Sequence, residues 1–348
     1  KDLIAWKFLT GVEYNDPEKF PYSAVIDRKL GVKDAMALLR LHEDYIGQDQ
    51  ELYHSKSEGI CRTTSHDSIV YNLTADPTLT EAWKTLGRPC QSVFVPLYPL
   101  AGPAKGTAFT DPATATKEHF AGTPAMFDYR ADFTPHSVFS ASNNAIDYLR
   151  GDELAKRTQL IQAEEDKFMK DRAAVTKKAA GLKGEERTKF LHDYNQKSYD
   201  HVLKIMQAEN ARLMPNKVKI LADVVKADGD GTVDFALLGA KGHEVLSANM
   251  EATRAGMSAN QLNSTRQWKN FAPAEKMVYK DVNNDGITDV VFTFKAKDVT
   301  KGAVAGAAMD LWLYTQINGH RVTGFDVVPV ENDKVKMHKG ARDGKGLL

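Results

Sequence analysis

The sequence has few cysteines, no net charge and no long apolar run, so three features that often indicate a class of function are absent. Among 348 residues there are two cysteines, which neither prove nor exclude an oxidising compartment. The 46 basic and 46 acidic residues cancel, so no excess charge points to nucleic acid or an anionic membrane as a partner. No apolar run approaches the roughly 20 residues that a membrane span needs.

What remains is an ordinary globular composition. Hydrophobic residues make up 42% and charged residues 26% of the chain. A chain of this length exceeds one typical compact unit, so we expect two domains.

The stretch from Gly59 to Tyr98 predicts two strands with a long connection between them. Side chains alternate along a strand, so residues 60–73 divide into two faces. Residues 92–98 are apolar on both faces, which predicts a sheet covered by another layer. If these strands pair, Cys61 and Cys90 lie close enough for a disulfide; two buried thiols are the alternative.

Several runs in this half resemble one family. They are Ile60-Cys61-Arg62-Thr63-Thr64-Ser65, Trp83, Gly87-Arg88-Pro89-Cys90, Ser92-Val93-Phe94-Val95-Pro96-Leu97-Tyr98, the run from Val32 to Arg40, and Ser137-Val138-Phe139 with Asn143. Together they are similar to the dipeptidase A type of cysteine peptidases, which are N-terminal-nucleophile (Ntn) hydrolases. The resemblance covers roughly residues 5 to 210.

The resemblance implies an αββα sandwich and amide hydrolysis by an amino-terminal cysteine whose own α-amino group is the base. The chain begins at Lys1, and neither cysteine lies near a terminus. We therefore expect the nucleophile on a separate, preceding chain of the same precursor. Arg62 is the best candidate for a pocket residue, because a guanidinium can orient a cysteine or bind a carboxylate; a structural ion pair is the alternative. Arg88 and Asn143 are weaker candidates on the same argument.

The periodicity predicts helices at residues 32–45, 137–150, 152–180 and 184–214. The last two form a hairpin, with a tight turn at residues 179–184. Apolar residues form one stripe on each helix, and we expect the charged residues between them to be a solvated face. Residues 99–124 predict a long irregular loop, either a wall of a substrate pocket or a cover for the sheet edge.

After Pro215 the hydrophobic period becomes that of strands. Strand-like runs occupy residues 217–225, 232–238, 290–295, 310–317 and 321–330, and Asn318-Gly319 predicts a hairpin. This region predicts an immunoglobulin-like antiparallel β-sandwich. Residues 231–239 and 281–292 resemble a module of secreted bacterial proteins, which implies a periplasmic, secreted or cell-surface location.

One loop of the sandwich offers hard oxygen ligands at alternating positions. Its candidate ligands for Ca²⁺ are Asp281, Asn283, Asp285, the carbonyl of Ile287, and Asp289. Gly286 permits the sharp turn, but Phe292 stands where an EF-hand has Glu. A turn in which these side chains bond only to the local backbone is the alternative.

The histidines show no spacing of zinc ligands, and a lone helical histidine such as His42 is usually a surface or core residue. Ser65-His66-Asp67 cannot converge on a strand, so it is not a catalytic triad.

The sequence thus predicts an α+β chain. We expect the second part of an Ntn-type αββα domain at residues 1–150, a helical hairpin at 151–214, an immunoglobulin-like β-sandwich at 215–330 and a flexible basic tail at 331–348. The expected function is a subunit of an extracytoplasmic, dipeptidase-like amide or peptide hydrolase, and a homo-oligomer is possible. The alternative is an inactive surface or assembly protein with a calcium-stabilised sandwich.

Overall fold

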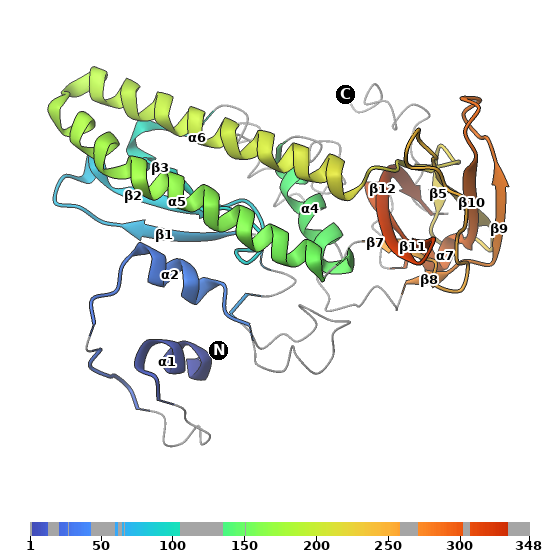
Figure 1. The fold of residues 1–348 in the computed structure, drawn as a ribbon, viewed down its shortest axis with the longest axis horizontal. Coiled ribbons are helices and arrows are strands. Elements are labelled where there is room, and N and C mark those ends of the chain that lie inside the picture. Colours follow the sequence, from blue (N-terminus) through green and yellow to red (C-terminus); the bar gives the residue numbers. More distant parts are fainter. Residues whose placement is uncertain are drawn as a thin grey trace. The chain divides into compact units, whose positions relative to one another are not determined.

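The computed structural model describes residues 2–12, 21–26, 28–42, 60–61, 65, 67–104, 135–149, 151–257, 271–301 and 307–332. It mixes helices with largely antiparallel sheets, in agreement with the predicted α+β class (Figure 1). The chain divides into two compact units. The first comprises residues 1–105 and 151–203, and the second comprises residues 106–150 and 204–348.

The first unit contains an antiparallel sheet of three strands in the order β1-β2-β3. These are β1 (Ser68–Asn72), β2 (Glu81–Thr85) and β3 (Val95–Leu97). The sequence analysis predicted the outer two and missed β2, which pairs with both, so the predicted direct pairing was wrong. The first strand is also shorter than predicted, because Ile60 and Cys61 lie in a bend before it.

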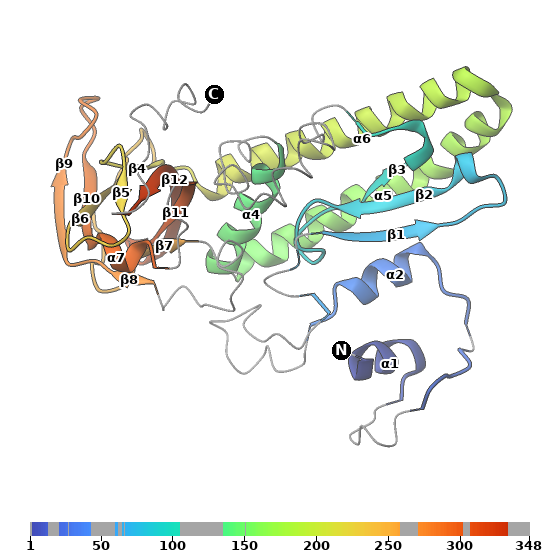
Figure 2. The ribbon, with the colours of Figure 1, turned by 180° about the vertical axis from the view of Figure 1, so that it is seen from behind.

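Figure 2 shows the described helices of the first unit together with this sheet. They are α1 (Asp2–Thr10), α2 (Val32–Leu39), α5 (Asp152–Gly181) and α6 (Gly184–Leu213), whose last residues belong to the second unit. Helix α2 contacts β1 and α5 contacts β3. The break between α5 and α6 is where the sequence predicts it, whereas α2 ends at Leu39, with Arg40 as its C-cap, rather than near residue 45. The two-sheet Ntn arrangement stays a prediction.

The second unit has two sheets that share one apolar core. The first has the order β4-β6-β10-β9 and the second β5-β12-β11-β7-β8. The strands are β4 (Val218–Ile220), β5 (Val225–Lys226), β6 (Thr232–Leu237), β7 (Arg254–Met257), β8 (Ala272–Pro273), β9 (Lys276–Lys280), β10 (Asp289–Lys295), β11 (Ala307–Ile317) and β12 (His320–Glu331). The antiparallel pairing that the sequence predicts is present in both sheets, except that strand β5 pairs with β12 in parallel. An immunoglobulin-like topology stays a prediction.

The hairpin predicted at Asn318-Gly319 is confirmed. It joins β11 to β12, which pair from Ala307–Val330 to Ile317–His320. Both turn residues have positive φ, 51° for Asn318 and 79° for Gly319. Asparagine and glycine tolerate this conformation best, and its twist matches that of the strands.

Helix α4 (Pro135–Leu149) belongs to the second unit and packs against β12. The Tyr148 hydroxyl donates to the Thr315 carbonyl at 2.7 Å, and Arg321 donates to the Tyr148 carbonyl at 3.0 Å. This grouping differs from the boundary predicted at residue 150. The physical reason is that the end of α4 satisfies its polar groups on β11 and β12.

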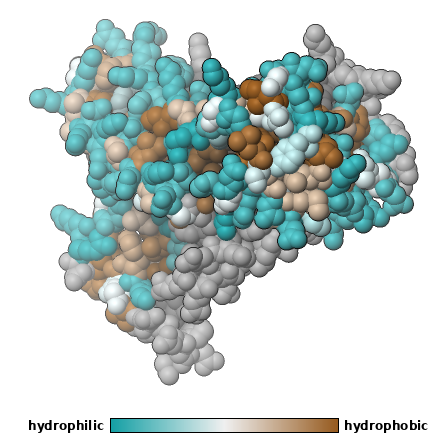
Figure 3. All heavy atoms as spheres, turned by 45° about the vertical axis from the view of Figure 1, so that its right-hand side comes forward, coloured by the Kyte–Doolittle hydropathy of each residue, from teal (hydrophilic) through white to brown (hydrophobic). Residues whose placement is uncertain are grey.

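Hydrophilic residues cover most of the face shown in Figure 3, and hydrophobic residues form separate groups on it. Within the described ranges, no helix combines the length and apolar character needed to cross a membrane.

Candidate functional site

The segment Gly87–Phe94, which connects β2 to β3, is the buried part of the family-like sequence, and we call it the connecting loop. Its tightest turn is closed by a bond of 3.0 Å from the Gln91 N–H to the Arg88 carbonyl. The Arg88 side chain is 1% exposed, and it donates to the Gln91 side-chain oxygen at 3.2 Å. A guanidinium so far from water must be held by polar partners, because burying an unpaired charge is costly.

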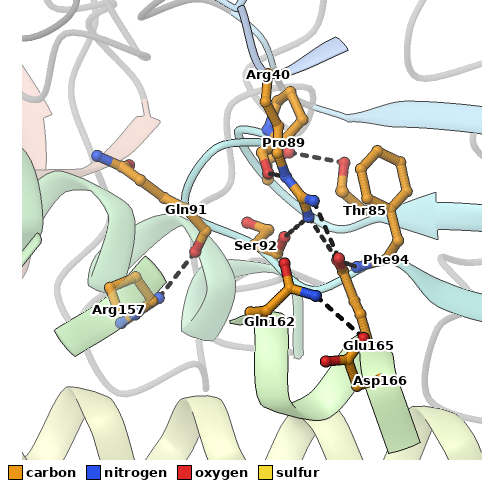
Figure 4. Close-up of polar contacts among 11 residues, drawn as sticks. Arg40, Thr85, Pro89, Gln91, Ser92, Phe94, Arg157, Gln162, Glu165 and Asp166 are labelled. Carbon is orange, nitrogen blue, oxygen red and sulfur yellow. Dashed lines mark hydrogen bonds and ion pairs between the residues drawn. The ribbon is translucent and has the colours of Figure 1, made fainter. Parts of the chain in front are cut away.

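Arg40, at the end of α2, ties the connecting loop to α5 (Figure 4). Its Nε donates to the Pro89 carbonyl at 2.7 Å, and its Nη2 donates to the Ser92 carbonyl at 3.3 Å. The same guanidinium forms a two-point ion pair with Glu165 of α5. Glu165 also accepts a bond of 2.8 Å from the Phe94 N–H. The buried carboxylate of Glu165 therefore binds both the backbone just before β3 and the side chain of Arg40, which holds the loop.

A second arginine reaches the loop from α5. Arg157 is fully buried, and it donates to the Gln91 carbonyl at 2.9 Å (Figure 4). An irregular buried segment has no ladder to satisfy its carbonyl groups, so side chains must do so. Together Arg40 and Arg157 donate hydrogen bonds to three backbone carbonyl groups of the loop, those of Pro89, Gln91 and Ser92.

Beyond β3 the chain is held by α6. Asn195 accepts from the Tyr98 N–H at 2.7 Å and donates to the Tyr98 carbonyl at 3.1 Å. Burial raises the pKa of the Tyr98 hydroxyl, which keeps it protonated over the physiological range. On β2, Glu81 is buried and accepts from Arg172 of α5 at 2.7 Å and from Trp83 at 3.2 Å. These contacts extend the polar network along the sheet.

The structure describes two of the three predicted catalytic residues, and they belong to different units. Arg62 lies outside the described residues, as do residues 105–124 of the predicted pocket loop and the tail from residue 333. Arg88 lies in the connecting loop of the first unit. Asn143 is 1% exposed on α4 in the second unit. Arg88 is thus the described candidate that belongs to the loop.

Sequence reasoning missed the residues that hold the loop. The charged residues of α5 were expected to form a solvated face, but Arg157, Glu164 and Glu165 are buried. That expectation was wrong for a reason visible in the spacing: Arg157, Ile161, Glu165 and Phe168 follow one another at intervals of four or three residues. These charges therefore lie in line with the apolar stripe, and that alignment was the available signal.

The predicted calcium loop is closed by its own side chains. Asp281 accepts from the Gly286 N–H at 2.8 Å, and Asp285 accepts from the Ile287 N–H at 2.8 Å. The Gly286 N–H holds the pKa of Asp281 below its usual value, so this side chain is ionised at neutral pH. Asn283 donates to Asp285 at 2.8 Å. The local bonding that defined the Asx-turn alternative is therefore present.

Asp289, the last predicted calcium ligand, differs from the others because it is fully buried at the start of β10. Its two carboxylate oxygens accept from the N–H groups of Gly239 and Val282, each at 2.8 Å. These bonds tie the loop, through Val282, to Gly239 after the neighbouring strand β6. The role of Asp289 as a calcium ligand stays a prediction.

Comparison with protein-family models gives no match, and no curated protein matches the chain. The family resemblance therefore rests on the sequence motifs alone.

Proposed function

We propose that the chain is a subunit of an extracytoplasmic amide or peptide hydrolase of the dipeptidase type. Its nucleophilic cysteine belongs to a preceding chain of the same precursor. The thiolate would attack the carbonyl carbon, the C–N bond would break, and the amine would leave with the proton that the α-amino group took from the thiol. Water would then hydrolyse the thioester, which releases the acid and restores the thiol. In this scheme Arg62, Arg88 and Asn143 are alternative candidates, each considered by itself, for the residue that orients the thiolate or binds a substrate carboxylate.

The observation that carries the proposal is the fixed connecting loop. It contains the family-like run Gly87–Cys90, and both Arg40 and Arg157 hold its backbone. Catalysis favours groups that are already in place before the substrate arrives, since less reorganisation is then needed. Arg88 is a positively charged residue of this loop, whose backbone is held in place. A purely structural use of Arg88 is the competing interpretation, and kinetics separate the two.

The test uses the full precursor, purified through a carboxy-terminal tag. Amino-terminal sequencing and intact mass measurement should find a second chain that begins with Cys, and the sample should hydrolyse dipeptides. A sample that contains a single polypeptide and hydrolyses none of a broad dipeptide set would overturn the proposal.

Variants then test the arginines. Arg88→Lys keeps the charge but loses the planar fork, and we expect kcat/KM to fall by about tenfold or more while the protein stays folded. Arg62→Ala should behave similarly. Arg212→Ala, which removes an exposed pair with Glu209, is the matched control and should leave kcat/KM unchanged. If Arg88→Lys lowers only the folded fraction, Arg88 is structural.

A second candidate is an inactive surface or assembly protein whose β-sandwich binds calcium. The exposed side chains of Asp281 and Asp285 in one loop, together with the lowered pKa of Asp281, favour it. Calcium should then raise the melting temperature of the second unit by several degrees, since a ligand that binds only the folded state stabilises it. Asp281→Asn should remove this rise, whereas Asp223→Asn, an exposed carboxylate elsewhere in the unit, should not. An equal melting temperature with calcium and with a chelator would exclude the calcium site.

A further inference from the structure

Three residues that are far apart in the sequence meet beside the connecting loop. One ring nitrogen of His42 and the sulfurs of Cys61 and Cys90 all lie within 4.8 Å of one another. The two cysteines are 2% and 9% exposed, and their sulfurs are 3.4 Å apart, as thiols rather than as a disulfide. The sequence analysis found no spacing for a zinc site because these ligands come from three separate segments.

Backbone hydrogen bonds place two of these segments together. The Leu41 carbonyl accepts from the N–H groups of both Ile60 and Cys61, at 3.1 and 3.0 Å. Cys61 is therefore held against the residue that precedes His42. This arrangement does not depend on the thiol or the imidazole, so two of the three side chains are positioned by the main chain.

The third segment, which carries Cys90, is held by the side chain of Arg40. Arg40, two residues before His42, donates to the Pro89 carbonyl at 2.7 Å, and Cys90 follows Pro89. The turn from Arg88 to Gln91 encloses Cys90. Each of the three side chains thus stands next to a residue that is fixed by a hydrogen bond. Hydrogen bonds among the residues around the ligands are what keep the ligands of a metal site oriented.

We propose that His42, Cys61 and Cys90 bind a thiophilic divalent transition-metal ion, of which Zn²⁺ is the type. Zn–S bonds of 2.3 Å in a tetrahedron put two sulfurs about 3.8 Å apart, so small shifts of the side chains suffice. Two thiolates also cancel the charge of the ion, which suits a buried place. Sulfur and imidazole are poor ligands for calcium, so this site is distinct from the loop at Asp281.

The fourth position of the ion is taken by a ligand outside this set, a water molecule being the simplest. The ion would join the end of α2 to the connecting loop, and so reinforce the link that Arg40 makes. This proposal does not depend on the hydrolase assignment, since it concerns ligands and not turnover.

The experiment titrates the reduced, metal-free full chain with Co²⁺ and then with Zn²⁺. We expect one Co²⁺ per chain, an absorption band from thiolate-to-cobalt charge transfer, and loss of that band when Zn²⁺ is added. Cys61→Ser and Cys90→Ser should abolish the band, and His42→Gln should weaken Co²⁺ binding about tenfold or more. His320→Gln, which changes an exposed histidine of the second unit, should bind as the unchanged protein does.

If the cysteine variants fail to fold, the unchanged chain still decides the question. Zn²⁺ should slow alkylation of both thiols under native conditions and raise the melting temperature, and a chelator should reverse both effects. No cobalt band and no protection would overturn the proposal. A native mass that is two hydrogen atoms lighter would also overturn it, because the sulfurs would then form the disulfide that the sequence equally allowed.

Discussion

The two units differ in the charged side chains that they bury. In the second unit the two sheets share a hydrophobic cluster with residues such as Phe235, Phe292 and Leu313 fully buried, and Asp289 is the buried charged residue among those described there. In the first unit, Arg88, Arg157 and Glu165 are buried beside Trp83 and Phe94. Paired strands satisfy their own backbone, so side chains from two sheets can meet without polar partners. In a short sheet with a buried irregular loop, the loop backbone lacks hydrogen bonds to a neighbouring strand. The side chains of arginine and glutamate supply those hydrogen bonds instead.

The largest expected effect tests the apolar core. Phe235→Ala removes a fully buried ring whose centroid lies 5.2 Å from that of Phe294. We expect the free energy of unfolding to fall by about 3–5 kcal/mol, since a cavity adds to the lost transfer energy. Hydrogen exchange should show faster opening of β6 and β10. Val278→Ala, on a more exposed strand position, should cost no more than about 0.5 kcal/mol.

The next effect tests the polar core. Glu165→Ala leaves Arg40 and the Phe94 N–H without their shared acceptor. We expect a loss of about 3 kcal/mol, measured by denaturant unfolding of the first unit. Asp166→Ala, which breaks an exposed pair with Lys33, should cost no more than about 1 kcal/mol.

A double variant sharpens the comparison. In Arg40→Met with Glu165→Leu, both charges of the ion pair are absent, so much of the stability should return. The connecting loop should nonetheless exchange its amide hydrogens faster, because the bonds from Arg40 to the Pro89 and Ser92 carbonyls are gone. If the loop stays equally protected, the pair is not what holds it.

A smaller effect is expected at the hairpin of the second unit. Gly319→Ala places a side chain at φ 79° and should destabilise the hairpin by about 1 kcal/mol, as read from hydrogen exchange of β11 and β12. Gly231→Ala is the control, because a methyl group there meets no atom within 4 Å. Equal losses at both positions would contradict the conformational explanation.

Sequence reasoning did best where the pattern is local. The break before Gly184 and the turn at Asn318-Gly319 were both predicted, because each depends on a few adjacent residues. Strand β2 was missed, since its sequence Glu-Ala-Trp-Lys-Thr does not alternate cleanly, and its buried Glu81 is paired with Arg172. Such a partner, 91 residues away, is not visible in a local pattern.

The candidate site was predictable only in part for the same reason. Arg88 was chosen from a motif, and the structure buries it. Arg40 ends another family-like run but was given no role, and its partner Glu165 carried no motif. The meeting of His42 with Cys61 and Cys90 depends on the fold of three segments. Contacts between distant segments are set by packing, so they cannot be predicted from the local hydrophobic periodicity of the sequence.

The smallest effect concerns a polar pair at the edge of the first unit. Burial raises the pKa of Glu164, but hydrogen bonds from Lys167 at 2.6 Å and His201 at 2.7 Å outweigh it and hold the pKa below its usual value. A lowered carboxyl pKa gives stability that is present above the unfolded pKa of about 4.3 and lost as the pH falls through the folded value.

Glu164→Gln should therefore reduce the difference in unfolding free energy between pH 6 and pH 3 by roughly 0.5 kcal/mol, a small amount because the Lys167 and His201 side chains are 62% and 46% exposed. Urea unfolding at the two pH values measures it, with Asp171→Asn on the same helix as the control. An unchanged pH dependence would mean that the pair at the edge contributes nothing. The buried ion pair of Arg40 and Glu165 would then be the part of the polar core that stabilises the first unit.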